Sequence, residues 1–147
     1  MLETPHVAVG AAIVAAIPNP LISIPLAFAS HFILDMTPHW NPHLNTETKK
    51  FGHLTNQTLL IIGLDLACAL VLTAFLYKYT DNPYILFGAF ASILPDVVEG
   101  PYFLWGWKNK YVNIWMKFQK SIQVDANIFW GTITQLVVVG FCLLWMF

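Results

Sequence analysis

The sequence predicts an all-α fold, an integral membrane helical bundle of four to five apolar helices with one interfacial amphipathic segment. Of the 147 residues, 57% are hydrophobic and only 10% are charged, whereas a soluble domain usually carries about 25% charged residues. The mean hydropathy is +0.62. Seven lysines, no arginine and eight acids cannot cover a water-soluble globule. We therefore expect most of the surface to face lipid and a single transmembrane domain over residues 1–147.

The helices are predicted from apolar runs that turn signals separate. The first run, residues 7–17, is too short to cross a bilayer of roughly 30 Å at about 1.5 Å per residue, so it predicts a short or re-entrant helix. After Pro18-Asn19-Pro20, a second apolar segment continues to about Met36, and the two can form a helical hairpin. Further helices are predicted at residues 57–77, 84–99 and 126–147.

Two segments are polar enough to lie outside the apolar bundle. Residues 37–56 collect prolines, histidines and lysines and predict a polar loop at the membrane surface. Residues 102–125 alternate aromatic residues with lysines, which is typical of an interfacial helix at the level of the lipid headgroups. Counting crossings puts both segments and the N-terminus on one side, with six of the seven lysines. Because lysine-rich loops stay cytoplasmic, we expect the N-terminus inside and the C-terminus outside.

Composition also bears on the classes of function. The first residues show no basic region followed by a small-residue cleavage site, so we expect the first helix to be retained. The formal net charge is −1 and the lysines form no runs, which argues against a nucleic-acid partner. Cys68 and Cys142 lie in apolar stretches and read as small hydrophobic residues. The oligomeric state is left open.

Ionisable side chains within apolar helices indicate a functional site, because each costs several kcal/mol when it is unpaired. His31, Asp35 and His39 follow one another at intervals of four residues. The first two must share a helical face, about 5 to 6 Å apart. An imidazole and a carboxylate at this spacing can hold one divalent metal, as two histidines one turn apart do in zinc proteases.

The predicted topology brings more polar residues to the same end of the bundle. His6 lies at the start of the first helix, Asp96 and Glu99 lie near the end of the fourth, and Asp65 lies in the first half of the third. Together with His31 and its neighbours, these side chains offer six or seven nitrogen and oxygen ligands at one level. That number is enough for one metal ion or a pair.

Short motifs resemble those of bacterial and archaeal membrane-bound metal-dependent hydrolases, which in turn resemble the zinc-dependent phospholipase C group. Ser30-His31-Phe32-Ile33-Leu34-Asp35 is similar to their S-H-L-L-L-D signature. Pro5-His6-Val7-Ala8-Val9-Gly10 is similar to their H-x-x-x-G start, and Leu94-Pro95-Asp96 to an L-P-D stretch. Gly52-His53 is faintly similar to a G-H-R segment. In that family the L-P-D stretch precedes the H-x-x-x-D motif, whereas here it follows.

The cluster of ionisable residues and the resemblance of the motifs together predict a hydrolase embedded in a prokaryotic inner (plasma) membrane. It would use one or two divalent ions, zinc or alternatively manganese, to hydrolyse an ester or phosphodiester at the cytoplasmic interface, with membrane lipid as the natural substrate. The assigned roles are metal ligands for His6, His31, Asp35 and Asp96, a further ligand or acid for His39, and base or outer support for Glu99 or Asp65.

Other roles stay open for the same residues. The rival hypothesis is a non-enzymatic membrane protein in which the whole cluster serves as an ion or proton relay, or as contacts between packed helices. Individually, His6 can be a satisfied core residue, Asp65 can hydrogen-bond a neighbouring helix through Thr or Asn, and Glu99 can simply end a helix. His43 and His53 lie in the polar loop, where solvated side chains are the norm.

Overall fold

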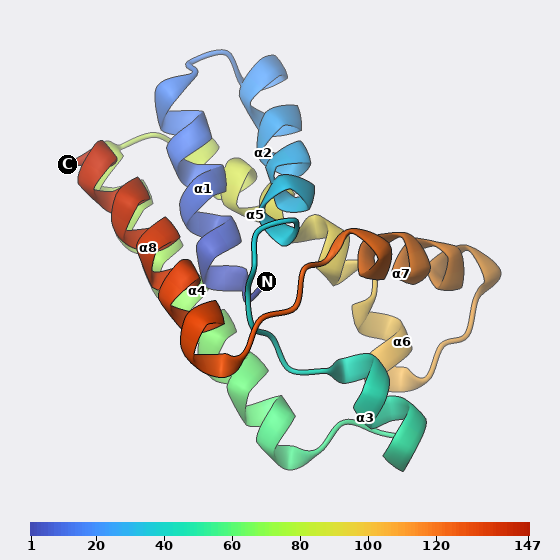
Figure 1. Cartoon of the computed structure of the whole chain (residues 1–147). Coiled ribbons are helices and arrows are strands. Elements are labelled where there is room, and N and C mark those ends of the chain that lie inside the picture. Colours follow the sequence, from blue (N-terminus) through green and yellow to red (C-terminus); the bar gives the residue numbers. More distant parts are fainter.

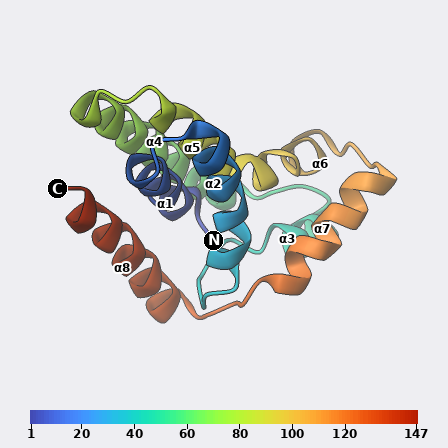
Figure 2. The ribbon, with the colours of Figure 1, turned by 90° about the horizontal axis from the view of Figure 1, so that it is seen from above.

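The computed structural model describes residues 1–147 and contains eight α-helices and no β-sheet, which confirms the all-α prediction (Figure 1). Five of the helices form an elongated bundle, and three short ones gather beside one end of it (Figures 1 and 2). The bundle helices are α1 (Glu3–Ala16), α2 (Pro20–Asp35), α4 (Asn56–Thr80), α5 (Tyr84–Val97) and α8 (Ile128–Met146). The short helices are α3 (Leu44–Phe51), α6 (Gly100–Trp105) and α7 (Lys110–Ile122).

Two helices, α4 and α8, are long and apolar enough to cross a membrane. Their most apolar stretches have mean hydropathies of 2.5 and 1.9, and only 11% and 17% of those stretches are buried inside the protein. Such helices need an apolar environment for their outer faces. The helices α2 and α5 are also apolar but shorter. Of the four to five apolar helices that the sequence predicts, two are therefore long and apolar enough to span a membrane.

The first helix, α1, is the central helix of the bundle. It contacts α2, α4, α5 and α8, and Figure 2 shows it enclosed among them near the middle of the bundle. Its small and apolar side chains Val7, Ala8, Ala11 and Val14 are buried. Its 14 residues agree with the short helix that the sequence predicts. Because α1 is central, any polar group that it carries is placed inside the bundle.

Two glycines let α1 and α5 approach closely. A Cβ atom at Gly10 would lie 2.5 Å from the carbonyl oxygen of Gly88, and one at Gly88 would lie 2.4 Å from a methyl group of Val14. Small residues at a helix crossing allow this backbone contact in membrane bundles. The crossing sets the register between the two helices, and with it the position of His6 relative to the end of α5.

Polar N-caps define where four helices begin. A side-chain oxygen accepts a hydrogen bond from a backbone N–H of the first turn in α2, α4, α7 and α8, the capping residues being Asn19, Thr55, Asn109 and Asn127. These caps satisfy backbone donors that the helix leaves unpaired. Asn and Thr beside apolar runs are therefore the local signals for these starts.

The prediction that residues 37–56 form only a loop is wrong for the eight residues of α3. Its sequence places Glu47 in the first turn and two lysines in the last, charges that suit the helix dipole, and Gly52 ends it at a φ of 78°. The Glu47 carboxylate also accepts hydrogen bonds from the Thr55 N–H and the Thr58 hydroxyl. In the same way, residues 102–125 contain two helices instead of one, because Gly106 ends α6 at a φ of 66°.

The segment between α7 and α8 forms backbone hydrogen bonds with the segment that follows α2. The His39 N–H donates to the Val124 carbonyl (3.1 Å), and the Ala126 N–H donates to the His39 carbonyl (2.7 Å), which forms a short parallel bridge. The Gln135 amide of α8 donates to the Trp40 carbonyl (2.8 Å). These contacts fix the backbone around His39, which belongs to no helix.

The close Gly10–Gly88 crossing predicts that a branched side chain at position 88 destabilises the fold. We expect Gly88→Val to lower the free energy of unfolding by about 1–3 kcal/mol, because the new side chain meets Val14 and the Gly10 backbone. The matched control is Gly140→Val in α8, where a Cβ atom meets nothing within 4 Å. Thermal unfolding in detergent micelles measures both. Equal midpoints for the two variants would contradict the close crossing.

Candidate metal centre

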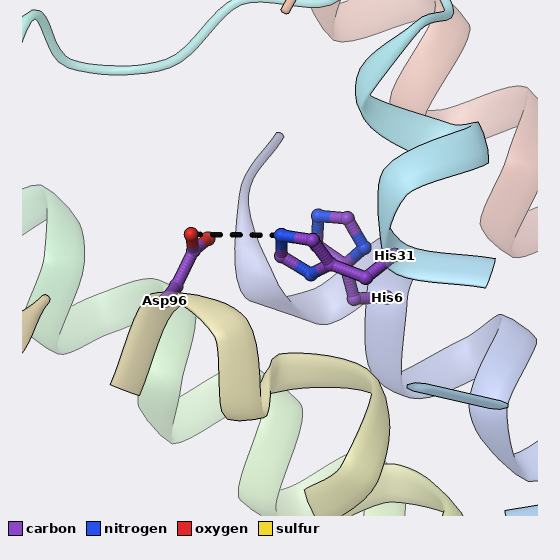
Figure 3. Close-up of side chains that lie close together, drawn as sticks. All are labelled: His6, His31 and Asp96. Atoms are coloured by element: carbon purple, nitrogen blue, oxygen red, sulfur yellow. Dashed lines mark ion pairs between the residues drawn. The ribbon is translucent and has the colours of Figure 1, made fainter. Parts of the chain in front are cut away.

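Five ionisable side chains from four parts of the chain meet at one end of the bundle. His6 comes from α1, His31 and Asp35 from α2, His39 from the segment after α2, and Asp96 from the end of α5. The first four are fully buried, and the Asp96 side chain is 24% exposed. Figure 3 shows His6 and His31 side by side, with Asp96 facing His31. The sequence predicts four of them as metal ligands and His39 as a further ligand or acid.

The Asp35 carboxylate lies between three imidazole rings. Its Oδ1 atom is 3.5 Å from Nε2 of His6 and 3.8 Å from Nε2 of His39, and its Oδ2 atom is 3.6 Å from Nε2 of His31. The same His31 nitrogen lies 3.6 Å from Oδ1 of Asp96. These separations exceed ordinary hydrogen-bond lengths. Two ligands of one tetrahedral zinc ion lie about 3.3 Å apart, given bonds of about 2.0–2.2 Å.

Backbone carbonyls fix the orientation of two of the rings. Nδ1 of His31 lies 2.8 Å from the Ser92 carbonyl oxygen, and Nδ1 of His39 lies 2.8 Å from the Thr37 carbonyl oxygen. A carbonyl only accepts, so each Nδ1 carries the hydrogen and donates it. In the neutral ring the lone pair then lies on Nε2, the atom that faces Asp35. Metal-binding histidines are commonly held in this manner.

Some imidazole nitrogens in this cluster have no hydrogen-bond partner and are free to bind a cation. Neither ring nitrogen of the buried His6 has a hydrogen-bond partner, and Nε2 of His39 has none either. Burial lowers the pKa of His39, which keeps its ring neutral. Nε2 of His31 faces only oxygen atoms, those of Asp35, Asp96 and Gln119. A nitrogen so placed requires a proton or a metal ion, and His6, His31 and Asp96 have their ligand atoms within 4.8 Å of one another.

Other groups complete the charge balance around Asp35. The α-amino group of Met1 donates a hydrogen bond to Oδ1, and the Gln123 amide donates to Oδ2 over 3.3 Å. A buried carboxylate needs several such partners, because burial without them is costly. Asp35 is therefore the anionic centre of the cluster.

Sequence reasoning missed Gln119, one of two buried residues on the mostly exposed helix α7. Its amide nitrogen donates to the Pro95 carbonyl (3.2 Å), to Oδ1 of Asp96 (3.1 Å) and to Oε1 of Glu99 (2.9 Å). Its oxygen lies 3.1 Å from Nε2 of His31. An uncharged glutamine among lysines and aromatic residues carries no local signal of a site. Its place on the buried face of the amphipathic helix, beside Met116, is the signal that could have found it.

Sequence reasoning also missed Glu3, at the start of α1. Its Oε2 atom is buried and has no hydrogen-bond partner, and it lines the same cavity as Asp96 and Glu99. The site therefore contains one more carboxylate than predicted. Glu3 precedes the first apolar run, where a helix start would carry an acid for purely local reasons, so the sequence alone does not single it out.

Asp65 lies outside the group of convergent ligands. Its carboxylate caps the start of α1, accepting from the Glu3 N–H (2.5 Å), the Thr4 N–H (3.2 Å) and the Thr4 hydroxyl (2.6 Å). Of the two roles left open for Asp65, hydrogen bonding to a neighbouring helix is the one that these contacts show. His43 and His53 are exposed, as expected for the polar loop.

Glu99 lies two residues beyond the end of α5, on the wall of a cavity of about 280 Å³. Burial raises the pKa of Glu99 to about 7, while the hydrogen bond from Gln119 opposes the shift and the nearby Asp96 adds to it. A carboxyl group that titrates near neutral pH is suited to accept and return a proton. Both apolar and polar side chains line the cavity, among them Glu3, Asp96, Leu66, Val97, Leu104 and Lys120.

No known protein family, curated protein or solved structure matches the chain. The resemblance of its short motifs to membrane-bound metal-dependent hydrolases stays an expectation.

The raised pKa of Glu99 predicts how stability depends on pH. Unfolded Glu99 ionises near its ordinary pKa of 4.5, whereas the folded group stays protonated up to about pH 7. The neutral Glu99 carboxyl thus makes its full contribution to the free energy of unfolding below pH 4.5, and this contribution is lost as the pH rises through 7. We therefore compare the midpoint of thermal unfolding in chelator-treated proteins. Between about pH 5 and 8, we expect this midpoint to decrease less in Glu99→Gln than in the unmodified protein.

Glu47→Gln serves as the control for that measurement. Hydrogen bonds from Thr55 and Thr58 lower the pKa of Glu47. The stabilisation by the ionised Glu47 carboxylate is therefore lost only when the pH falls below the ordinary pKa of a glutamate. The slope between pH 5 and 8 should therefore stay as in the unmodified protein. An unchanged slope in Glu99→Gln would refute the assignment of the titration to Glu99.

Proposed function

We propose that the chain is a membrane-embedded, metal-dependent hydrolase that cleaves an ester or phosphodiester of a lipid at the cytoplasmic interface. One observation carries the proposal: three buried imidazoles, two of which have ring nitrogens without hydrogen-bond partners, converge on the carboxylates of Asp35 and Asp96 at one end of an apolar bundle. Such a group has little use as mere packing, because each unpaired polar atom destabilises the fold. Beside it lies a cavity large enough for part of a substrate.

His6, His31 and Asp96 would hold the metal, with Asp35 and His39 as neighbouring ligands for the same ion or a second one. Two to three imidazole nitrogens with carboxylate oxygens favour zinc, and manganese is the alternative. A divalent ion held there would activate water and polarise the bond to be cleaved. The carbonyls of Ser92 and Thr37 orient the rings of His31 and His39 for this role.

Glu99 is the residue that we assign to proton transfer. It lies on the cavity wall and its pKa is near 7, so it can take a proton from water and return it to a leaving group. Gln119 donates to both Glu99 and Asp96 and so fixes their relative positions. Asp65 holds the N-terminal end of α1, next to His6, and supports the site from outside.

The surroundings of the cavity support a lipid substrate. Its apolar wall comes from α4, α5 and α6, and the outer faces of α4 and α5 carry many exposed hydrophobic side chains. With α2 and α5 beside α4 and α8, four or five helices would lie in the inner (plasma) membrane of a prokaryote. The site would face the cytoplasm, because the lysine-rich segments α3 and α7 flank it.

The rival proposal is a non-enzymatic protein in which the cluster relays ions or protons or holds helices together. It would need Nε2 of His31 to carry a proton instead of a metal ion. A relay also requires polar groups through the whole depth of the bundle, whereas α8 contains no ionisable group except Cys142. The cluster is confined to one end, which favours the hydrolase.

Metal content is the first test. We expect protein purified in detergent under metal-replete conditions to hold about one or two equivalents of zinc or manganese, and His31→Ala to lose them. His53→Ala is the matched control, because His53 is exposed and belongs to no ligand group. Elemental analysis by mass spectrometry gives the stoichiometry. A folded wild-type protein without metal would favour the rival proposal.

Hydrolysis of lipids tests the chemistry. On a panel of phospholipids in mixed micelles, we expect Glu99→Gln to lower kcat by about 10²–10⁴-fold while the metal content stays unchanged. The double variant His31→Ala, Asp35→Ala should lose both metal and activity. If activity survived in the double variant with its metal removed, the site would be wrong.

A further inference from the structure

We propose that residues 105–120, here called the basic aromatic segment, bind the headgroups of anionic phospholipids. The segment comprises the end of α6, the connection through Gly106 and most of α7. The inference needs the chain to lie in a membrane and is independent of the hydrolase chemistry. Its partner is a lipid surface, distinct from a substrate in the cavity.

The charge of the segment is the first observation. Four of the seven lysines lie in it, and no Asp or Glu occurs between Glu99 and Asp125, so residues 100–124 carry four positive charges in a chain of net charge −1. Only Lys120 has an acidic partner, Asp125 at 2.6 Å. The lysines at 108, 110 and 117 are exposed and form no ion pair. An anionic surface would supply the missing counter-charges.

The arrangement of side chains around α7 is the second observation. Met116 and Gln119 are buried against the protein. A separate stripe of Tyr111, Ile114 and Phe118 is apolar yet 78%, 55% and 46% exposed. Lys110 and Lys117 lie on the third face, next to this stripe by helical spacing. An apolar stripe beside a lysine stripe is typical of helices that lie in a membrane interface.

Exposed tryptophans extend this surface before α7. Trp105 and Trp107 are 77% and 63% exposed, on either side of Gly106. Indole rings favour the headgroup level of a bilayer, where an apolar ring and a polar N–H are both accommodated. Figures 1 and 2 show α6 and α7 projecting from the bundle on the side away from α8. Aromatic rings next to unpaired lysines therefore match an anionic headgroup layer.

The same helix reaches the candidate metal centre on its buried face. Gln119 contacts His31, Asp96 and Glu99, and the Trp115 indole N–H donates to the Pro95 carbonyl over 3.0 Å. Headgroup binding on the outer face thus acts on the helix whose inner face positions two carboxylates of the site.

Lipid selectivity tests the proposal. The full chain is reconstituted in phosphatidylcholine bilayers that contain a small fraction of either brominated phosphatidylglycerol or brominated phosphatidylcholine, and quenching of tryptophan fluorescence is measured. We expect stronger quenching by phosphatidylglycerol, with a binding preference of up to about fivefold per lysine at low ionic strength. The preference should decrease in high salt, because salt screens exposed charges.

Two triple variants locate the effect. Lys108→Gln, Lys110→Gln, Lys117→Gln should remove the preference, whereas the matched control Lys49→Gln, Lys50→Gln, Lys78→Gln removes three charges elsewhere and should keep it. All six lysines are exposed, so both variants should fold, which circular dichroism checks. Equal quenching of the unmodified protein by both lipids would overturn the proposal. Equal loss of preference in the two triple variants would also overturn it, because it would trace the effect to total charge.

Discussion

The carboxylate of Asp35 has no contact with solvent, yet it lies at the end of a bundle made almost entirely of apolar side chains. A buried charge of this kind must be compensated by nearby donors or cations. The chain meets this demand from several directions, with imidazoles on α1, on α2 and on the segment after α2, an amide before α8 and the Met1 amino group. Segments far apart in the sequence therefore converge on this one group.

Close packing around α1 makes that convergence possible. The glycine crossing between α1 and α5 brings His6 and Asp96 to the same level, and Asp65 on α4 holds the first turn of α1 through its N–H groups. On the other side, the bridge at Val124 and Ala126 holds His39 without a helix. Each imidazole is thus positioned by backbone contacts, which define a site more closely than side-chain packing alone.

The metal hypothesis and the packing hypothesis differ in what satisfies the imidazole nitrogens. If the cluster only joined helices, a proton on Nε2 of His31 would pair with the Gln119 oxygen at 3.1 Å. Nε2 of His6 and Nε2 of His39 would instead face Asp35 across 3.5 and 3.8 Å, distances too long for good hydrogen bonds. These ligands would instead satisfy a divalent ion if they moved to its bond lengths. The cavity of about 280 Å³ beside Glu99 adjoins this cluster, because Asp96 also lies on its wall.

The sequence by itself determined the all-helical class, the apolar helices α4 and α8, and the ligand candidates His31 and Asp35, because apolar runs and an interval of four residues are local properties of a chain. It also singled out His6, Asp96 and Glu99, since ionisable residues next to apolar runs are conspicuous. It gave no sign of Gln119 or Glu3, and it left the role of Asp65 open. Those roles depend on which helix faces which, and only the tertiary structure decided this, because the Gly10–Gly88 crossing and the attachment of α7 to Pro95 join residues that are distant along the chain.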